Sequence, residues 1–460
     1  MIKKSTLLFL TLIAGLFISC DTKSESPPEL QFSEVNFENI PFEMPKLKIP
    51  DYGELAKISI VDLGAVSNNK EKTSEAIKMA IDSVHKMGGG TVVIPKGEWL
   101  TKTIHFKSNV NLHLDEGAVL LFSEDPNDYL PAVKTSWEGM ECINYSPLVY
   151  AYECENIAIT GKGELKAKID VWKTWFSRPK AHMNSLKRLY YLAANDSAMA
   201  NRNMVNDSSH LRPHFIQFNR SKNILLEDVT ITNSPFWTIH PYQCENVVIK
   251  GLNVYAHGHN NDGVDPEMSK NMLIENCVFD QGDDAISVKA GRNQEAWRLN
   301  APAENIVIRN CKVKNGHQLL AIGSELSGGI KNVYMENCDV ADGAKLFHLL
   351  FIKTNERRGG YVDGIYMKNI TSGKIDKGIL GIETDVLYQW RDLVPTLEKK
   401  LTPITNIYLE NFKAKDVQFI SKIEGQEELS IENVVLKNVT ASNVSGEEIR
   451  NENVTNFEMK

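Results

Sequence analysis

The chain of 460 residues contains no long run of lysine or arginine, and its formal net charge is −8. Binding to nucleic acid depends largely on neutralising phosphates with basic side chains, so this composition excludes nucleic acid as a partner. After the first twenty residues, the chain also has no apolar run long enough to span a bilayer. We therefore expect a body with no membrane-spanning segment.

Cysteine is scarce beyond Cys20. Four of the six remaining cysteines occur at similar points of repeated segments, where a buried thiol acting as a small apolar side chain explains them more simply than a bridge. The sequence therefore predicts neither a disulfide framework nor a zinc site. The six are Cys142, Cys154, Cys244, Cys277, Cys311 and Cys338.

Residues 1–20 have the features of an export signal. Lys3 and Lys4 precede a short apolar stretch, and Ser19-Cys20 resembles a bacterial lipobox, in which cleavage leaves Cys20 as the lipidated first residue. The alternative is a plain signal peptide with an incidental cysteine. Residues 21–50 are rich in Ser, Glu and Pro and predict an extended tether. We expect an exported protein, a periplasmic or outer-membrane lipoprotein of a Gram-negative bacterium that meets the membrane only through its lipid anchor.

Internal repeats indicate the fold. Short β-rich segments led by asparagine recur, and successive leading asparagines from 223 to 332 are separated by 23, 25, 34 and 27 residues. Such segments cannot bury their apolar faces alone and must stack on the next coil, whereas helical repeats would need apolar residues at a spacing of 3.6. Residues 51–460 therefore predict an all-β domain, a right-handed parallel β-helix. The leading residues are Asn156, Asn223, Asn246, Asn271, Asn305, Asn332, Asn406 and Asn433.

Two segments depart from the repeat. From Thr73, as a candidate N-cap, an apolar stripe at helical spacing runs to the glycines at 88–90, which predicts a helix that caps the N-terminal end of the solenoid. Residues 170–210 are polar and helix-like, with several aromatic side chains. We expect this insertion to form a wall of the groove.

Aspartates cluster in consecutive coils. Asp262 precedes the pair Asp283-Asp284 by about one coil, which places these carboxylates about 5 Å apart along the solenoid axis at the backbone. Gly282 permits a bend that turns both members of the pair outward. Close carboxylates cannot all ionise freely, and a proton held by one beside a charged partner is what general acid and base catalysis require. Each aspartate alone is explained as well by a turn or a calcium ligand, but the joint pattern, followed by Gly316-His317, favours catalysis.

These motifs resemble those of glycoside hydrolase family 28, the polygalacturonase family, over about residues 58 to 375. The segments 260–262, 282–284 and 316–317 are similar to the family's Asn-Thr-Asp, Gly-Asp-Asp and Gly-His-Gly motifs. The resemblance implies inversion at the anomeric carbon and no metal or organic cofactor. It implies Asp283 as general acid, Asp262 and Asp284 as the residues that hold the attacking water, and His317 as a group that tunes the acid.

The resemblance also implies a pectic polysaccharide or oligogalacturonide as substrate. We expect a monomer that binds the substrate through Asn260, Lys289, Arg292 and Lys353. The family's Arg-Ile-Lys motif reads Phe351-Ile352-Lys353 here, and an aromatic ring cannot hold a uronate carboxylate as a guanidinium does.

Two substrate classes therefore stay open. Lys353 with Lys289, Arg292 or Arg357 can bind galacturonate, which we favour, or Phe351 can stack on a less acidic sugar of a rhamnose-containing or branched pectin. The sequence is also compatible with a calcium-dependent lyase and with a non-catalytic glycan-binding solenoid. The mode of attack is open too, although the insertion and the 271–305 coil with Trp297 favour exo action.

Overall fold

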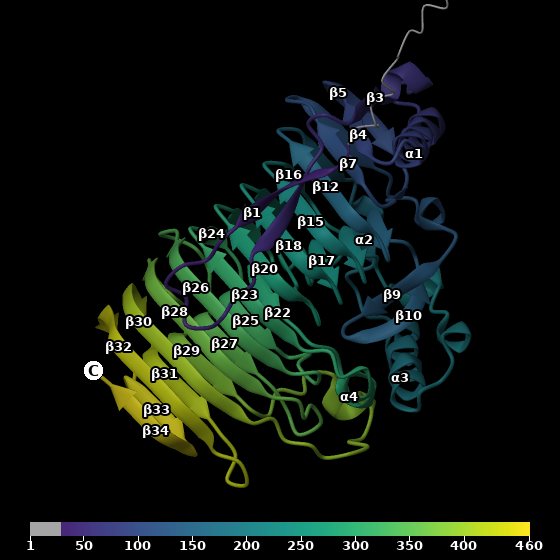
Figure 1. Ribbon diagram of the computed structural model, residues 1–460. Helices are drawn as coiled ribbons and strands as arrows, with labels where there is room; N and C mark the ends of the chain where they lie inside the picture. Colours follow the sequence, from purple (N-terminus) through teal and green to yellow (C-terminus); the bar gives the residue numbers. More distant parts are fainter. Residues whose placement is uncertain (1–28) are drawn as a thin grey trace, which may run out of the picture.

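The computed structural model describes residues 29–460, so the predicted signal and Cys20 lie outside the described residues. The chain winds as a parallel β-helix, and successive coils follow one another along the axis from the N-terminal to the C-terminal end (Figure 1). Neighbouring coils pair in parallel, as between Ile224 and Val247 or between Val247 and Met272. The predicted β-helix is confirmed.

One large sheet of twenty strands wraps two sides of the solenoid. Its members are β3 (Ala56–Ser59), β4 (Gly90–Ile94), β5 (Gly97–Thr101), β7 (Val110–Leu114), β8 (Ala118–Phe122), β12 (Glu155–Gly161), β13 (Glu164–Ala167), β15 (Lys222–Glu227), β16 (Thr230–Thr232), β18 (Glu245–Lys250), β19 (Asn253–Ala256), β20 (Lys270–Glu275), β21 (Val278–Gln281), β23 (Ala303–Arg309), β24 (Lys312–Asn315), β26 (Ile330–Val340), β28 (Val362–Ser372), β30 (Ile404–Val417), β32 (Ile431–Val444) and β34 (Val454–Met459).

A third face carries two smaller parallel sheets, joined by isolated bridges at Val264, which pairs with Ile239 on one side and Ile286 on the other. The first sheet holds β6 (Ile104–His105), β11 (Val149–Tyr152), β14 (Ile216–Asn219) and β17 (Ile239–Tyr242). The second holds β22 (Ile286–Val288), β25 (Gln318–Gly323), β27 (His348–Lys353), β29 (Gly378–Glu383), β31 (Phe419–Glu424) and β33 (Ile449–Glu452).

The leading asparagines form hydrogen-bonded ladders. Asn223 donates to Asn156 and Asn246 donates to Asn223 through their side-chain amides, and the pattern resumes from Asn305 to Asn271. These asparagines have positive φ angles, a left-handed conformation that asparagine tolerates better than most residues. The sequence repeat thus marks the turn of each coil, as predicted.

The predicted N-terminal cap is helix α1 (Lys70–Lys86), whose stripe of Ala76, Ile77, Ala80, Ile81 and Val84 is buried against the first coils. The N-cap is Asn69, whose side chain accepts a hydrogen bond from the Lys72 amide, and not Thr73 as predicted. Thr73 is fully buried, and its hydroxyl donates to the Val66 carbonyl instead.

The 170–210 insertion is helical, as predicted, and it lies beside the hairpin of β9 (Val133–Trp137) and β10 (Met140–Asn144) (Figure 1). Tyr190 of the insertion packs on Trp390, and the two rings are 5.7 Å apart. The helical elements are η1 (Ile60–Leu63), η2 (Pro126–Tyr129), α2 (Asp170–Thr174), α3 (Lys180–Ala194), η3 (Met199–Arg202), η4 (Asp207–Ser209), α4 (Asn293–Leu299) and α5 (Trp390–Leu393). No helix among residues 29–460 combines the length and apolarity needed to cross a membrane.

Residues 29–51, which we call the strap, are docked on the large sheet. Strands β1 (Gln31–Val35) and β2 (Leu47–Asp51) pair antiparallel, and Leu47 and Ile49 are buried on outward-facing apolar side chains, including Leu225 and Val248. The backbone of Lys48 exchanges two hydrogen bonds with the Asn246 side chain. The expected extended tether is therefore wrong for residues 29–50, because apolar residues between the prolines match an apolar row on the sheet.

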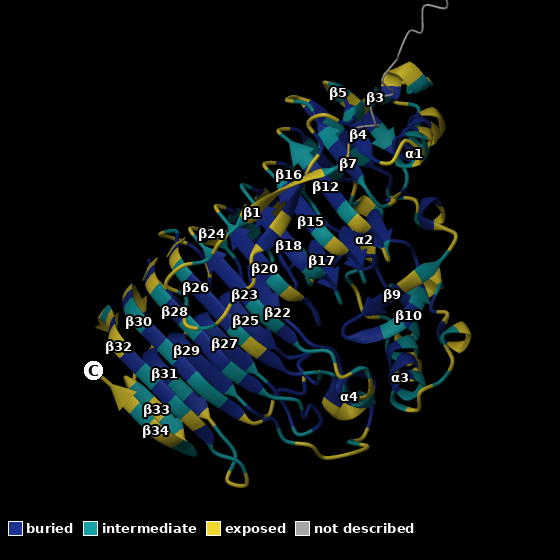
Figure 2. Cartoon of the chain, in the orientation of Figure 1, coloured by how far each residue is buried: buried dark blue, intermediate teal, exposed yellow. Residues whose placement is uncertain are grey.

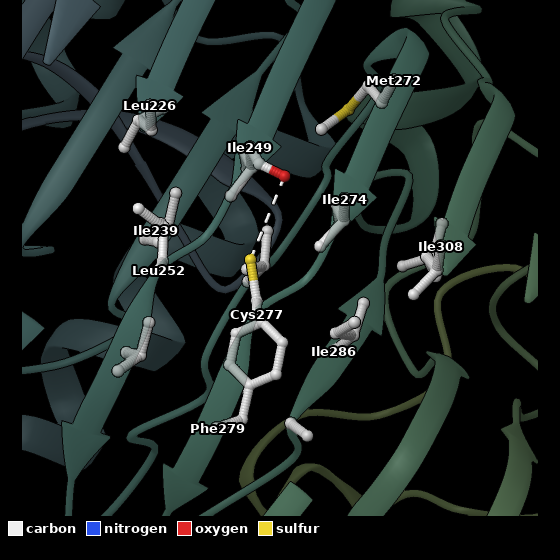
Figure 3. Packing of buried hydrophobic residues seen from close by; sticks show 14 of the residues in the cluster. Leu226, Ile239, Ile249, Leu252, Met272, Ile274, Cys277, Phe279, Ile286 and Ile308 are labelled. Carbon is white, nitrogen blue, oxygen red and sulfur yellow. Dashed lines mark hydrogen bonds between the residues drawn. The ribbon is translucent and has the colours of Figure 1, made fainter. Parts of the chain in front are cut away.

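The interior of the coils is apolar and buried as far as β32, whereas β33 and β34 at the C-terminal end have only intermediate and exposed residues (Figure 2). Figure 3 shows this packing around Cys277, which lies among Ile249, Ile274 and Phe279. All six cysteines of the described chain are buried free thiols, which confirms that no disulfide framework forms.

Candidate active site

A pocket of about 490 Å³ opens on the third face, where the two smaller sheets meet. The lining includes all four residues predicted for catalysis and four of the residues predicted for substrate binding, but not Arg357. These residues come from neighbouring coils and from loops outside the solenoid. The predicted members are Asn260, Asp262, Asp283, Asp284, Lys289, Arg292, His317 and Lys353.

Backbone register positions the aspartates. The Gly263 amide donates to the Asp284 carbonyl at 3.0 Å, and Val264 pairs with Ile286, so Asp262 lies directly beside Asp284 in the next coil. The segment stays close because Gly263 has no side chain: a Cβ there would be 2.4 Å from the Ala285 carbonyl oxygen. Gly282 likewise leaves room for the backbone of Gly258. The coil spacing in the sequence therefore predicts the convergence of the carboxylates.

Asp283 is paired with His317. The distance from His317 Nδ1 to Asp283 Oδ1 is 3.0 Å, and both side chains are partly exposed to the pocket. The hydrogen bond to Asp283 raises the pKa of His317 above its usual value. Burial opposes the charged form of Asp283, but the hydrogen bond and positive charge of His317, helped by Lys353 and Lys289, hold the pKa of Asp283 below its usual value.

Asp284 is buried and paired with Lys353, whose Nζ donates to Asp284 Oδ2 at 2.9 Å. The other oxygen, Oδ1, has no hydrogen-bond partner among the described residues. A buried carboxyl oxygen that has no partner and lies next to the pocket can accept a hydrogen bond from a water or a sugar hydroxyl.

Asp262 forms a second acidic pair with Asp265, a buried residue that lies behind it. Burial, followed by the charge of Asp283, raises the pKa of Asp262 well above its usual value, and the pKa of Asp265 is raised by burial and by Asp262. The Lys289 ammonium lies 3.7 Å from Asp262 Oδ2 and 3.5 Å from Asp265 Oδ1. Two buried carboxyls beside a single ammonium cannot both ionise freely, so this arrangement favours a proton on one of them.

Arg292 is committed to protein partners. Its guanidinium donates to carboxylate oxygens of Glu138 and Glu325 and lies 4.4 Å from the Trp390 ring. Burial alone would raise the pKa of Glu325, but Lys289, Arg292 and Arg358 hold it below the usual value. Arg292 therefore stabilises the rim of the pocket.

Asn260 and Arg357, both named from the sequence, differ in placement. Asn260 lies at the pocket, where its Oδ1 accepts a hydrogen bond from Arg212 Nη2 at 3.0 Å. Arg357 is buried away from the pocket and donates to Thr396 and to the Trp390 carbonyl. The neighbouring Arg358 lines the pocket instead.

Phe351, which replaces the family's arginine, is 5% exposed and stacks on His348 with ring centroids 4.5 Å apart. Gly381 makes room for this stack, because a Cβ there would lie 2.8 Å from the His348 ring. His348 covers one face of the Phe351 ring, and little of the rest is exposed, so Phe351 contributes to packing. The alternative in which Phe351 stacks on a sugar would need an exposed ring face, which Phe351 does not present.

The β9–β10 hairpin, which sequence reasoning missed, covers the groove on the N-terminal side of the aspartates. Thr135 donates to the Gln217 side chain of β14, and Ser136 Oγ donates to Glu267 Oε2. Gln217 and Glu267 are fully buried as a result, and Glu138 at the hairpin tip lines the pocket. The groove is thus closed on this side.

Other lining residues that sequence reasoning missed lie in the insertion or in the turns of coils, where no sequence repeat marks them. They are Arg178, Trp237, Phe347, Lys377 and Tyr388.

Asp283, Asp284 and His317 also present one possible ligand atom each within 4.8 Å of one another, which is close enough for a metal ion. The Lys353 ammonium, however, already donates to Asp284, and His317 already bonds Asp283. An ammonium and a metal compete for the same carboxylate, so the residues fit a metal-free acid and base pair better than a cation site.

Comparison with known proteins adds a family and several relatives. Residues 190–459 match the family model described as glycosyl hydrolases family 28. The crystal structure of a hyperthermoactive exopolygalacturonase from Thermotoga maritima is similar over 91% of this chain and 94% of that one, with 34% identity and a TM-score of 0.81.

Two curated sequences are also similar. A probable polygalacturonase of Vitis vinifera is 27% identical over 80% of this chain and 70% of its own length. An exo-poly-α-D-galacturonosidase of Dickeya chrysanthemi is 29% identical over 61% of this chain and 49% of its own length.

Proposed function

The chain belongs to glycosyl hydrolase family 28, and we propose that it hydrolyses α-galacturonide linkages of pectin by inversion, with aspartates as acid and base. It is a glycoside hydrolase of the polygalacturonase type. The observation that carries the mechanism is the Asp283–His317 pair facing the Asp262 and Asp284 carboxylates in one pocket.

Asp283 is the general acid, and His317 supplies its proton. The hydrogen bond between the two side chains favours one proton on the pair, located on His317, because it raises the pKa of His317 and lowers that of Asp283. When the glycosidic oxygen displaces solvent from Asp283, the loss of hydration disfavours the separated charges, and the proton moves to the carboxyl that faces the leaving oxygen. Asp283 then protonates that oxygen as the glycosidic bond breaks.

Asp284 and Asp262 position the water. Asp284 accepts a proton from the water through its unpaired Oδ1, while Lys353 stabilises the other oxygen. Asp262, which shares a proton with Asp265, donates a hydrogen bond that orients the same water. A carboxylate that takes the proton of the water, opposite an acid that protonates the leaving oxygen, is the arrangement that an inverting glycosidase requires.

Attack is of the exo type. The hairpin covers the groove floor on one side of the aspartates, so a polysaccharide cannot run through the site in both directions. On the other side, the surface continues over Phe347 and Lys377 of later coils. A chain end therefore enters from the C-terminal side and stops below the hairpin tip.

The location stays a proposal that rests on the sequence. Lys3 and Lys4, the apolar stretch and Ser19-Cys20 favour export and lipidation at Cys20. The proposal also includes that the protein contacts the membrane only through this anchor and that it is a monomer. Mass spectrometry of the membrane fraction, comparing the wild type with Cys20→Ala, would detect the acyl groups, and an unmodified Cys20 would contradict lipidation.

The activity is tested by reducing-sugar release, with chelator present, from polygalacturonate, rhamnogalacturonan and short oligogalacturonides. We expect release from the galacturonides without the ultraviolet absorbance of an unsaturated product, and mono- or disaccharide products from the first minutes. Ultraviolet absorbance that requires calcium would instead indicate a lyase. Sugar release from rhamnogalacturonan alone would show that this polymer, and not a galacturonide, is the substrate. Binding without any release would indicate a glycan-binding protein.

A further inference from the structure

Most basic side chains at the pocket already have protein partners. Lys353 is paired with Asp284, and Lys289 lies between Asp262 and Glu325. Arg358 donates to the Ser324 hydroxyl and carbonyl and to Asn293 Oδ1. A basic side chain that is bonded to other protein groups adds positive potential to the site, but it has fewer donors left for a substrate carboxylate.

Arg178 and Lys377 differ from the other basic residues. Both line the pocket, both are exposed, and within residues 29–460 neither side chain has an ion pair or a hydrogen bond. An unpaired cation that lines a pocket has all its donors available for an anionic ligand.

The coil register places Lys377 on the open side of the site. Gln318 pairs with His348, and His348 pairs with Gly378, so the residues just before them, His317, Phe347 and Lys377, form one column. Two coil spacings separate the His317 and Lys377 backbones, a distance of about 10 Å. The Lys377 Nζ lies 5.6 Å from the centroid of the Phe347 ring, which in turn contacts His317.

Arg178 lies on the other side. It belongs to the insertion, just before α3. A Cβ at Gly258, in the coil of Asp262, would be 2.5 Å from the Phe176 ring, and the Arg212 guanidinium lies 4.9 Å from that ring, so the segment that leads to Arg178 lies over this earlier coil. Glu138 is the tip of the hairpin that closes the groove. The two free cations therefore flank the aspartates, with Arg178 towards the closed end and Lys377 towards the open end.

We propose that Arg178 and Lys377 bind the uronate carboxylates of two sugar residues on opposite sides of the scissile bond. They take over the recognition that Phe351 cannot perform, because its aromatic side chain has no donor. This assignment rests on the proposed function, since it requires a substrate with a carboxylate on each sugar. It makes the insertion and the turn before β29 the specificity elements of this enzyme.

The test compares Arg178→Gln and Lys377→Gln, each in an Asp283→Asn background that binds without turnover. Matched controls are Lys180→Gln in the same insertion and Lys345→Gln, both exposed lysines outside the pocket without ion pairs in the described chain. Calorimetry measures Kd for trigalacturonate and for its methyl ester. We expect each pocket variant to weaken trigalacturonate about tenfold and the ester less than about twofold, while the controls change neither.

The double variant separates one site from two. Independent sites predict that the two fold-changes multiply, whereas a shared carboxylate gives a double variant no weaker than the worse single variant and overturns the two-sugar assignment. Equal losses for acid and ester would also overturn it, since they indicate a structural role, and Lys377→Arg is expected to restore most of the affinity. If wild-type enzyme releases no sugar from galacturonides, the proposed function fails. Unchanged Kd in both variants, together with sugar release from galacturonides by the wild-type enzyme, overturns only this inference.

Discussion

At the scale of single residues, Asp283 and His317 act as one titrating unit. His317 keeps its proton above the usual histidine range, and Asp283 stays charged below the usual carboxyl range, so the state with one proton on the pair spans a broad interval of pH. Asp283 with its lowered pKa therefore depends on His317 as the source of the proton that it delivers.

Replacing Asp283 with Asn should lower kcat by about 10² to 10⁴-fold, because the leaving oxygen then receives no proton from the enzyme. The side chain is nearly isosteric, so the thermal midpoint should stay close to that of the wild type. Steady-state kinetics on oligogalacturonides checks the loss, and a variant that retains near-normal kcat would remove Asp283 from the acid role.

Replacing His317 with Asn should shift the alkaline limb of the kcat/KM profile to lower pH. In the wild type the last proton of the pair leaves at the raised pKa of His317, whereas in the variant it leaves at the lower pKa of a carboxyl. The pH profile of both proteins on one oligogalacturonide provides the measurement. An alkaline limb in the same place would show that another group limits the reaction at high pH.

Which residues were predictable depends on how each is placed. Asp262 and Asp284 occupy equivalent points of successive coils, and so do Asp283 and His317, so their spacing in the sequence predicts that they lie close together in space. Arg178 and the hairpin tip at Glu138 reach the same pocket from outside the coil repeat. No period in the sequence links such residues to the aspartates, and only the folded chain brings them together.

At the scale of elements, the asparagine ladder and the strap share one residue. Asn246 donates to Asn223 at 2.6 Å and to the Lys48 carbonyl at 2.8 Å, and it accepts from the Lys48 amide at 3.0 Å. Its acceptor is thus taken by the strap, and among the described residues it makes no ladder bond to Asn271. The repeat predicted the ladder, while the docking of the strap was hidden by the prolines around it.

Replacing Asn246 with Ala should lower the free energy of unfolding by about 2 to 3 kcal/mol, since it removes two hydrogen bonds to the Lys48 backbone and one ladder bond to Asn223. The control is Asn456→Ala at the exposed C-terminal coil, which has the same left-handed backbone but a single ladder bond. That change should cost below about 1 kcal/mol. Urea titrations of both variants make the comparison, and equal losses would show that backbone strain alone explains the effect.

At the scale of the whole molecule, the solenoid carries the site on one face and the strap on another. No residue of 29–51 lines the catalytic pocket. The strap covers an apolar row that spans several coils, from Ala158 to Val307, and this row would otherwise face solvent. Stability and catalysis are therefore served by separate surfaces of one fold.

Deleting residues 29–51 should leave kcat on oligogalacturonides unchanged but lower the thermal midpoint and increase the binding of a hydrophobic dye, because the apolar row becomes exposed. Differential scanning fluorimetry and an activity assay on the same preparation test both parts. A deletion variant with wild-type melting and dye binding would show that the strap contributes nothing to the coils it covers.

The hairpin that closes the groove on one side also determines the order in which the two products leave the site. In the exo attack that we propose, the released sugar is the one below the hairpin tip, and the remaining polymer is the part in the open mouth of the groove. The polymer must therefore depart before the small product can leave, and it cannot slide forward into the vacated end. Attack should be distributive, with every polymer chain in the mixture shortened slowly and together rather than one chain consumed at a time.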